Sequence, residues 1–292
     1  MRFTTRLPHW MLVLAGFSAL TIAAEPPPEL APAEYVYKQV GDVALKACVF
    51  ATPQSHAKRR PAVAVFHGGG WSIGKIEWTF GDARLLAAEG FVAVGVQYRL
   101  SNKADVTPIE AIADARDAIR WIRQHADMLG IDPKRIVALG WSAGGHLAAC
   151  TAVFTDPLAE IEASSAPNAL VLWFPALALE YDTAMPQLLL GRADRLKLSP
   201  DQYVRPGLPP TLILIGRQDT ATPLVGAEKF CQLMRAAGNR CDLHVYENVG
   251  HQFEDAPGHI DPQVSADSKQ RSLRFLRDVG MLTPDDAPAA QP

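Results

Sequence analysis

A serine lies between glycines in the segment Gly140–Gly144, which reads GWSAG. The segment joins two patterns: residues 136–140 form a short apolar run typical of a buried strand, and the small residues 143–152 favour a helix. A serine at such a sharp turn projects above the sheet, beside the N–H groups and the positive dipole end of the helix. We therefore predict that Ser142 is a nucleophile; the alternative is a glycine-rich turn that carries an ordinary exposed serine.

A serine hydroxyl needs a general base to become a strong nucleophile. Hydrolases with a serine at this kind of turn carry an acid and then a histidine later in the chain. His251 follows the last predicted strand, meets that order and is the predicted base. His259 is a weaker candidate, and the alternative for His251 is a loop histidine that packs on Phe253.

The acid should follow a strand between the serine and the histidine. Asp219 does so, because it ends a Gly-Arg-Gln-Asp segment after the apolar run 211–215. Its carboxylate would hold the imidazole in the productive tautomer and stabilise the imidazolium that forms. Asp242 and Glu247 are weaker candidates, and the alternative for Asp219 is a turn or helix-capping aspartate.

A glycine-rich segment, His67–Trp71 (HGGGW), directly follows the apolar run 62–66. Glycines let the backbone approach a substrate carbonyl and direct N–H groups at it, as an oxyanion hole requires. We predict that the N–H groups of Gly69, Gly70 and Ala143 form that hole. The alternative is a flexible glycine turn.

Around these residues the chain alternates strand-like and helix-like patterns. Residues 35–40 and 43–51 are separated by Gly-Asp, which predicts an antiparallel hairpin. Thr107, Pro108 and Glu110 predict a helix start with a capping box. Further strands are predicted at 62–66, 91–96, 136–140, 170–174, 211–215 and 243–246, and further helices at 80–89, 143–152, 222–237 and 266–278. The fold class is therefore α/β, with a mostly parallel central sheet and helices on both faces.

The N-terminus has the pattern of a signal peptide. Arg2 and Arg6 precede an apolar run that is too short to span a membrane comfortably, and Ala23 and Ala24 follow it. We expect cleavage after residues 1–24, export to the periplasm or out of the cell, and no stable membrane anchor in the mature protein. An uncleaved anchor or a buried helix is the alternative.

The rest of the chain divides by composition. A Pro/Ala-rich linker is expected at 25–34, a catalytic domain at 35–283 and a disordered tail at 284–292. Within the domain, the irregular stretch 175–210 contains several prolines and is a candidate substrate-pocket insertion.

Export would place the cysteines in an oxidising compartment, where disulfides persist. Cys231 lies within a helical pattern and Cys241 opens a strand-like run, so the pair is a candidate disulfide; two buried free thiols are the alternative. No cysteine has a neighbouring His or Asp that suggests a metal site. The net charge of −3 gives no reason to expect a nucleic acid or an anionic membrane as a partner.

Together these motifs resemble the α/β-hydrolase superfamily, specifically its carboxylesterase and acetyl-xylan/feruloyl esterase-like branch. The resemblance spans residues 35–282 and rests on segments 67–71, 98–101, 131–133 and 140–145, with Asp219, Gly250 and His251. It implies a serine esterase that needs no cofactor, acts on a small-molecule or polysaccharide ester, and is a monomer or a small homo-oligomer. Substrate loops gather at the carboxyl ends of parallel strands. A pocket role is therefore expected for four tryptophans, with ordinary packing as the alternative: Trp71, Trp78, Trp141 and Trp173.

Two features depart from the hormone-sensitive-lipase-like esterases. Their elbow usually reads Gly-Asp-Ser-Ala-Gly-Gly, whereas Trp141 takes the place of the aspartate here. Their acid usually lies in an Asp-Pro-Leu-x-Asp context, whereas Asp219 lies in Gly-Arg-Gln-Asp-Thr-Ala-Thr-Pro. Both features are more similar to the carbohydrate-esterase-like and peptidase-like members of the superfamily, which shifts the expectation toward esters of sugars or polysaccharides. A general short-chain carboxylesterase or lipase, a prolyl-oligopeptidase-like peptidase and a non-catalytic binding protein remain as alternatives.

Overall fold

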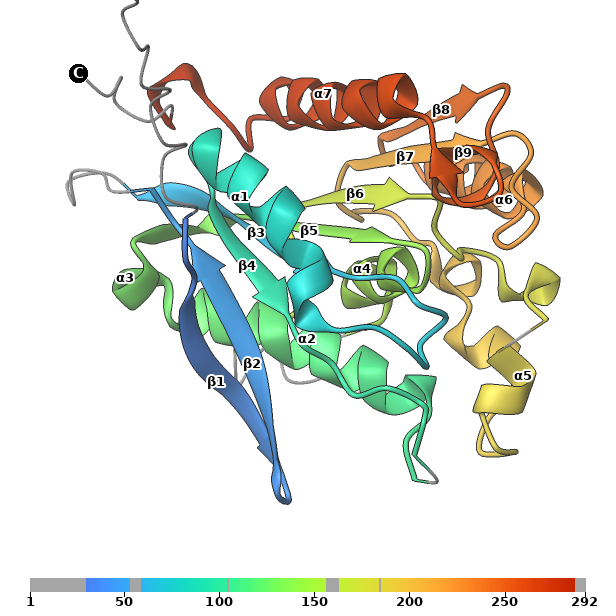
Figure 1. Cartoon of the computed structure of the whole chain (residues 1–292), viewed down its shortest axis with the longest axis horizontal. Helices are drawn as coiled ribbons and strands as arrows, with labels where there is room; N and C mark the ends of the chain where they lie inside the picture. Colours follow the sequence, from blue (N-terminus) through green and yellow to red (C-terminus); the bar gives the residue numbers. More distant parts are fainter. Residues whose placement is uncertain (1–29, 53–58, 104, 156–162, 184, 287–292) are drawn as a thin grey trace, which may run out of the picture.

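An eight-stranded sheet crosses the molecule in the order β1-β2-β4-β3-β5-β6-β7-β8 (Figure 1). The computed structural model describes residues 30–52, 59–103, 105–155, 163–183 and 185–286. The antiparallel part consists of β1 (Ala33–Val40) and β2 (Val43–Phe50), with β2 also antiparallel to β4 (Val92–Val96). The other strands pair in parallel: β3 (Arg60–Phe66), β5 (Ile131–Trp141), β6 (Ala169–Trp173), β7 (Thr211–Gly216) and β8 (Cys241–Tyr246). The predicted hairpin and mostly parallel sheet are confirmed.

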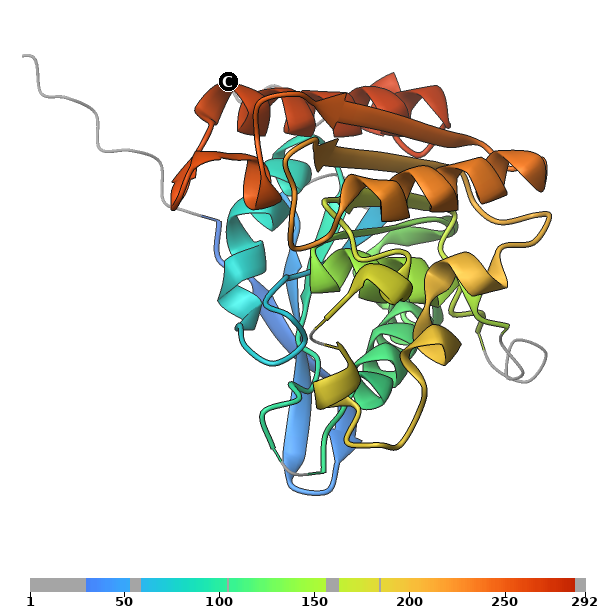
Figure 2. The same cartoon turned by 90° about the vertical axis from the view of Figure 1, so that its right-hand side faces the viewer.

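The central strands are short apolar runs because both faces of the sheet are covered. Every residue of β4 and β6 is buried. One face is covered by α1 (Phe80–Ala88) and α7 (Pro262–Asp278), and the other by α2 (Pro108–Gln124), α4 (Ala143–Val153) and α6 (Leu224–Ala236) (Figure 2). No helix in the described ranges is both long and apolar enough to cross a membrane.

Short elements complete the described chain. They are α3 (Ala126–Leu129), α5 (Met185–Leu188), the strand pair β9 (Glu254–Ala256) and β10 (His259–Ile260), and the 3-10 turns Ile76–Thr79, Leu179–Tyr181, Arg195–Leu198, Pro200–Tyr203, His251–Phe253 and Pro284–Asp286. Four of these elements lie in the stretch 175–210, whose weak periodicity reflects single turns rather than full helices.

Helix α2 begins as its sequence predicts. The Thr107 side chain accepts a hydrogen bond from the N–H of Ile109 at 3.3 Å, and the Glu110 carboxylate accepts one from the N–H of Thr107 at 2.7 Å. Arg192, from the 175–210 stretch, pairs with the same Glu110 carboxylate at 2.6 Å, so the helix start also anchors that stretch.

Two of the predicted domain boundaries need correction. Strand β1 starts at Ala33, inside the expected linker, because Ala33 already pairs with Val49. The tail was expected to be disordered from residue 284, but Pro284–Asp286 forms a turn in which the buried Asp286 pairs with Arg135 at 2.7 Å. The predicted signal peptide, residues 1–24, and the tail from residue 287 lie outside the described residues.

The two cysteines of the candidate disulfide lie side by side. Helix α6 ends against β8, and the thiol of Cys231 donates a hydrogen bond to the carbonyl of Cys241 at 3.2 Å. Both residues are buried free thiols. The spacing therefore predicted their proximity, but the structure contains no bond between the two sulfur atoms.

The start of α4 packs directly on the end of β3, and only glycine fits there. A Cβ atom added to Gly144 would lie 2.2 Å from the carbonyl oxygen of Phe66. We expect Gly144→Ala to lower the free energy of unfolding by about 1–3 kcal/mol, because the helix must move away from the strand.

Gly81 is the matched control, since it is also the second residue of a helix but has no atom within 4 Å of an added Cβ. Gly81→Ala should raise the free energy of unfolding by up to about 1 kcal/mol. Urea unfolding of both variants measures the contrast, and equal stabilities would refute the packing argument.

Candidate functional site

The predicted nucleophile occupies the turn between β5 and α4. Ser142 has φ 55° and ψ −122°, a conformation that costs a non-glycine residue about 1–3 kcal/mol. Its N–H donates to the carbonyl of Trp173 on β6 at 3.0 Å, which holds the turn against the sheet. The hydroxyl consequently points out of the turn rather than into the helix.

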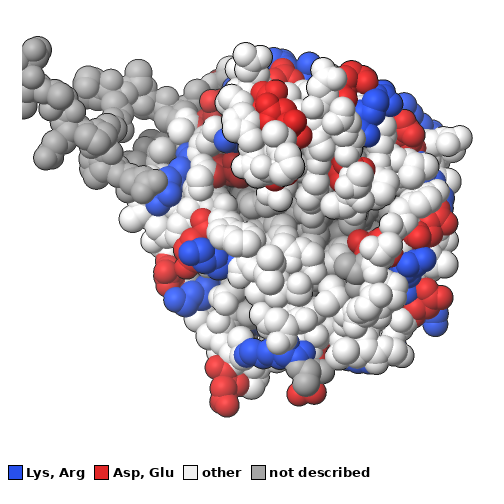
Figure 3. Space-filling view, turned by 45° about the vertical axis from the view of Figure 1, so that its right-hand side comes forward, with Lys and Arg blue, Asp and Glu red and all other residues white. Residues whose placement is uncertain are grey.

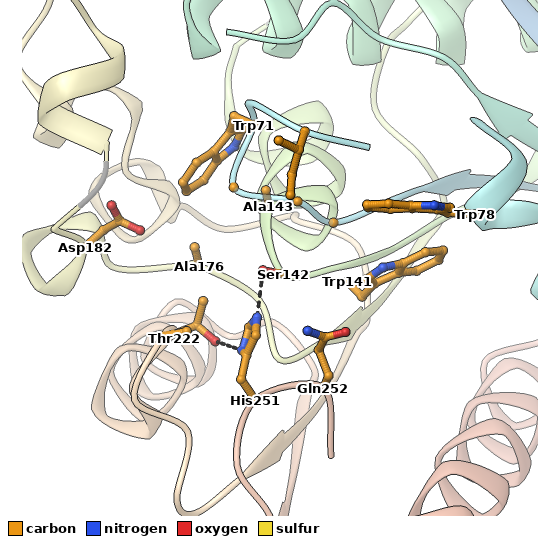
Figure 4. Close-up of a pocket in the computed structure, with 15 residues that line it drawn as sticks. Trp71, Trp78, Trp141, Ser142, Ala143, Ala176, Asp182, Thr222, His251 and Gln252 are labelled. Atoms are coloured by element: carbon orange, nitrogen blue, oxygen red, sulfur yellow. Dashed lines mark hydrogen bonds between the residues drawn. The ribbon is translucent and has the colours of Figure 1, made fainter. Parts of the chain in front are cut away.

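A continuous hydrogen-bonded chain joins the three residues predicted as the triad. Ser142 Oγ lies 2.9 Å from His251 Nε2, and His251 Nδ1 lies 2.8 Å from Asp219 Oδ2. Figure 4 shows the His251 ring directed at Ser142 across the floor of a pocket. With Nδ1–H donating to the carboxylate, Nε2 carries the lone pair that faces the serine hydroxyl. This arrangement can take a proton from Ser142 and later return it to a leaving group.

Backbone groups hold the Asp219 carboxylate in place. Its Oδ1 accepts hydrogen bonds from the N–H groups of Ala221 at 2.9 Å and Thr222 at 2.8 Å, which leaves Oδ2 for His251. The Thr222 hydroxyl lies 2.9 Å from both Asp219 Oδ2 and the carbonyl of Phe174, so its single proton can go to either acceptor. Asp219 is buried, and these donors replace the water that its charge loses.

The weaker candidates lie elsewhere. Asp242 pairs with Arg240 at 2.7 Å and Glu247 pairs with Arg217, both at the protein surface. His259 pairs with Asp255 at 2.6 Å, and its side chain is 66% exposed. None of these groups contacts Ser142 or His251.

The glycine-rich segment after β3 forms a tight turn beside Ser142. Gly69, Gly70 and Trp71 all have positive φ values of 115°, 56° and 59°. The carbonyl of Gly69 accepts the N–H groups of Ser72 and Ile73, and a Cβ on Gly69 would lie 2.2 Å from the carbonyl oxygen of Ile73. The turn therefore requires glycine at this position, as the motif predicts.

His67 orders this turn and is not part of the proton path. It is buried and stacks on Tyr98 at a ring-centroid distance of 4.4 Å. Its Nδ1 lies 2.6 Å from the carbonyl of Gly68, and the Tyr98 hydroxyl donates to the carbonyl of His67 at 2.8 Å. Burial lowers the pKa of His67, which favours the neutral ring.

A pocket of about 390 Å³ opens above these groups. The predicted oxyanion donors Gly69, Gly70 and Ala143 all line it, together with Ser142 and His251. Figure 3 shows the hollow on the face with the carboxyl ends of the strands, bordered mainly by residues without charge. The pocket is thus large enough for a small ester or one sugar unit, and its wall supplies little charge.

The predicted pocket tryptophans divide into two groups. Trp71, Trp78 and Trp141 line the pocket, but Trp173 does not. It lies behind Trp141, with the ring centroids 6.4 Å apart, and its Nε1 donates to Ser272 Oγ on α7 at 3.1 Å. The expectation for Trp173 is wrong because the side chain at the end of β6 turns toward the covering helix.

Trp78 and the 175–210 stretch, which contains Asp182, were expected at the pocket, whereas Gln252 and Thr222 were not. Trp78 faces the pocket on the same side as Trp141 and Gln252, whereas Thr222 and Asp182 lie on the opposite side (Figure 4). Asp182 is the one acidic side chain among the lining residues and comes from the 175–210 stretch. Its position after a single turn leaves no periodic signal in the sequence. No group of three or more metal-binding side chains occurs within the described part of the chain.

Comparisons with known proteins agree with this geometry. The BD-FAE family model matches residues 49–170. The chain is 27% identical over 223 residues to a probable isoprenylcysteine alpha-carbonyl methylesterase of Oryza sativa subsp. japonica, a match that covers 68% of this chain and 53% of that protein. The chain spans about half the length of this and the other plant methylesterases that it matches.

Solved structures of esterase 2 from Thermogutta terrifontis are similar along nearly their whole length. The form phosphorylated by paraoxon has a TM-score of 0.78 and 36% identity, and covers 89% of this chain and 98% of that chain. The butyrate-bound form has a TM-score of 0.79 and 35% identity, with the same coverage. With its mostly parallel sheet and this degree of identity, the chain belongs to the esterases of the α/β-hydrolase fold.

Proposed function

We propose that this protein is an exported serine esterase that hydrolyses short acyl esters of carbohydrates. The observation that carries the proposal is the hydrogen-bonded chain from Ser142 through His251 to Asp219 at the floor of an open pocket. The coarser assignment to the esterases rests on the comparisons, and the serine mechanism and the substrate class are our inference.

The reaction proceeds by acyl transfer in two steps. His251 Nε2 takes the proton of Ser142 as Oγ attacks the ester carbonyl carbon, and the new C–Oγ bond forms. The bond from the carbonyl carbon to the alcohol oxygen then breaks, and His251 donates the proton to the departing alcohol. Water attacks the acyl-serine in the same way, which releases the acid and restores the hydroxyl of Ser142.

The tetrahedral intermediate needs donors for its negative oxygen. Gly69, Gly70 and Ala143 line the pocket together with Ser142, and we propose that their N–H groups supply these donors. One such donor typically contributes a factor of about 10²–10³ to kcat. The related esterase 2 is phosphorylated by paraoxon, which supports an activated nucleophile in this chain as well.

The lining of the pocket supports a carbohydrate alcohol. The indoles of Trp78 and Trp141 offer flat apolar surfaces to the C–H face of a sugar ring, and Gln252 beside them offers an amide to its hydroxyl groups. Asp182 and Thr222 add acceptors on the opposite side. Such a mixture of apolar surface and few polar groups is typical of small-molecule sites.

A general short-chain carboxylesterase is the second candidate. Structures of the related esterase 2 contain butyrate or propionate, which favours a short acyl group without specifying the alcohol. Methyl esters, as in the names of the plant relatives, would also fit a pocket without demands on the alcohol. The two candidates differ in the contribution of Trp78 and Gln252 to binding.

The nucleophile and the substrate class can be tested together. We expect the parent protein to cleave p-nitrophenyl acetate and to release acetate from acetylated xylan, and Ser142→Ala to lower kcat by about 10⁴-fold or more on both. Ser265→Ala, on α7 away from the pocket, is the control and should match the parent. Cleavage of the aryl ester alone would favour the general carboxylesterase. An active Ser142→Ala variant would eliminate the proposed nucleophile.

The role of the acid has its own test. Asp219→Asn should lower kcat by about 10³–10⁴-fold, because an amide cannot hold the productive tautomer of His251 or stabilise the imidazolium. Asp242→Asn is the matched control, since Asp242 also lies between Ser142 and His251 in the chain but pairs only with Arg240 at the surface. Steady-state kinetics on p-nitrophenyl acetate distinguishes them; comparable losses in both variants would argue against Asp219 as the triad acid.

Export follows from the pattern of residues 1–24 and stays a prediction. The mature N-terminus should lie near residue 24 or 25, because small residues at Ala23 and Ala24 end the apolar run. N-terminal sequencing of protein from the periplasm and the culture medium measures this. Full-length protein found only in the cytoplasm would rule out the export proposal.

A further inference from the structure

Trp71 ends the proposed oxyanion turn in a conformation that a large side chain rarely adopts. Its φ is 59°, in the left-handed region, although the residue is not glycine. Two hydrogen bonds hold it there: its carbonyl accepts the N–H of Ser101 at 2.8 Å, and its indole Nε1–H donates to Nδ1 of His146 at 3.1 Å. The side chain is buried on one side and lines the pocket on the other.

His146 lies one helical turn after the proposed nucleophile. Its backbone N–H donates to the carbonyl of Ser142 at 3.1 Å, and its ring is fully buried. The second ring nitrogen, Nε2, lies 2.9 Å from the carbonyl of Leu198, so Nε2 carries the proton and Nδ1 is the acceptor for Trp71. Burial lowers the pKa of His146 to about 4, which keeps the ring neutral.

We propose that His146 is a positioning residue that sets the distance between the oxyanion donors and the nucleophile. This inference rests on the proposed function. One ring joins α4, which begins beside Ser142, to Trp71, the residue directly after Gly69 and Gly70. It also joins both to Leu198 in the 175–210 stretch.

The consequence for the reaction is geometric. Oxyanion donors act only when they lie about 2.7–3.1 Å from the developing negative oxygen. Without the bond to His146, the indole loses one of the two anchors of a strained turn, and the preceding N–H groups can rotate away from the carbonyl. The substrate still binds the rest of the pocket, so the loss falls on kcat more than on KM.

Two substitutions at position 146 separate the ring's bond to Trp71 from its bond to Leu198. Asn can place an amide oxygen near the position of Nδ1, which keeps an acceptor for Trp71 but removes the donor to Leu198. Gln can place an amide N–H near the position of Nε2, which keeps the donor to Leu198 but removes the acceptor for Trp71. Trp71→Phe removes the indole donor from the other side.

We expect His146→Gln and Trp71→Phe each to lower kcat on p-nitrophenyl acetate by about tenfold, and the double variant to lose no more than either single one. His146→Asn should stay within about threefold of the parent. Thr151→Val is the control, because Thr151 is equally buried on α4 but bonds only within its own helix. Thermal unfolding of each variant checks that the fold is kept.

A second readout needs no turnover. Hydrogen exchange at the Trp71 indole N–H, followed by NMR, should be slow in the parent and in His146→Asn and fast in His146→Gln. Three outcomes would overturn the inference. The losses in kcat of the two single variants could multiply in the double variant, or His146→Asn could have a kcat as low as that of His146→Gln. The third is an indole exchange rate in His146→Gln equal to that of the parent. A parent protein without Ser142-dependent esterase activity would instead refute the proposed function, and the exchange rates would still decide the Trp71–His146 contact.

Discussion

The site depends on one crowded turn, where β5 ends, Ser142 adopts a strained conformation and α4 begins against the end of β3. The strain is possible because Gly144 allows the helix to approach the Phe66 carbonyl and because Trp173 accepts the Ser142 N–H. The parallel sheet on both sides supplies the rigidity that opposes relaxation of the turn. The glycine-rich turn, Asp219 and His251 follow the ends of β3, β7 and β8 at the same edge of the sheet.

Few charged groups lie around that turn. The buried carboxylate of Asp219 is satisfied by backbone N–H groups and by His251, not by a cation. The two buried histidines beside the oxyanion turn, His67 and His146, both have lowered pKa values because of burial, so they act as neutral hydrogen-bonding rings. An uncharged surrounding strengthens the few polar interactions that form when an oxyanion develops.

The 175–210 stretch contacts both the pocket and the buried His146. It contributes Ala176 and Asp182 to the pocket wall, and Leu198 accepts the hydrogen bond from the buried His146. A change in this stretch can therefore alter both the shape of the pocket and the alignment of the oxyanion turn.

The sequence alone determined those features that depend on local pattern. Short apolar runs, the Gly-Asp hairpin turn and the capping box at Thr107 specify strands and helix starts through nearest neighbours, and these elements are confirmed. Ser142, Asp219 and His251 were recognisable because each follows a strand, and parallel strands place their ends at one edge of the sheet. Tertiary structure alone decided which side chains face the pocket. Trp173 turns to Ser272 while Gln252 faces the substrate space, and His146 inside an apolar helix bonds to Trp71, 75 residues earlier in the chain. Such contacts join residues far apart in the chain, and periodicity carries no information about which partner a side chain meets when helix, loop and sheet pack together.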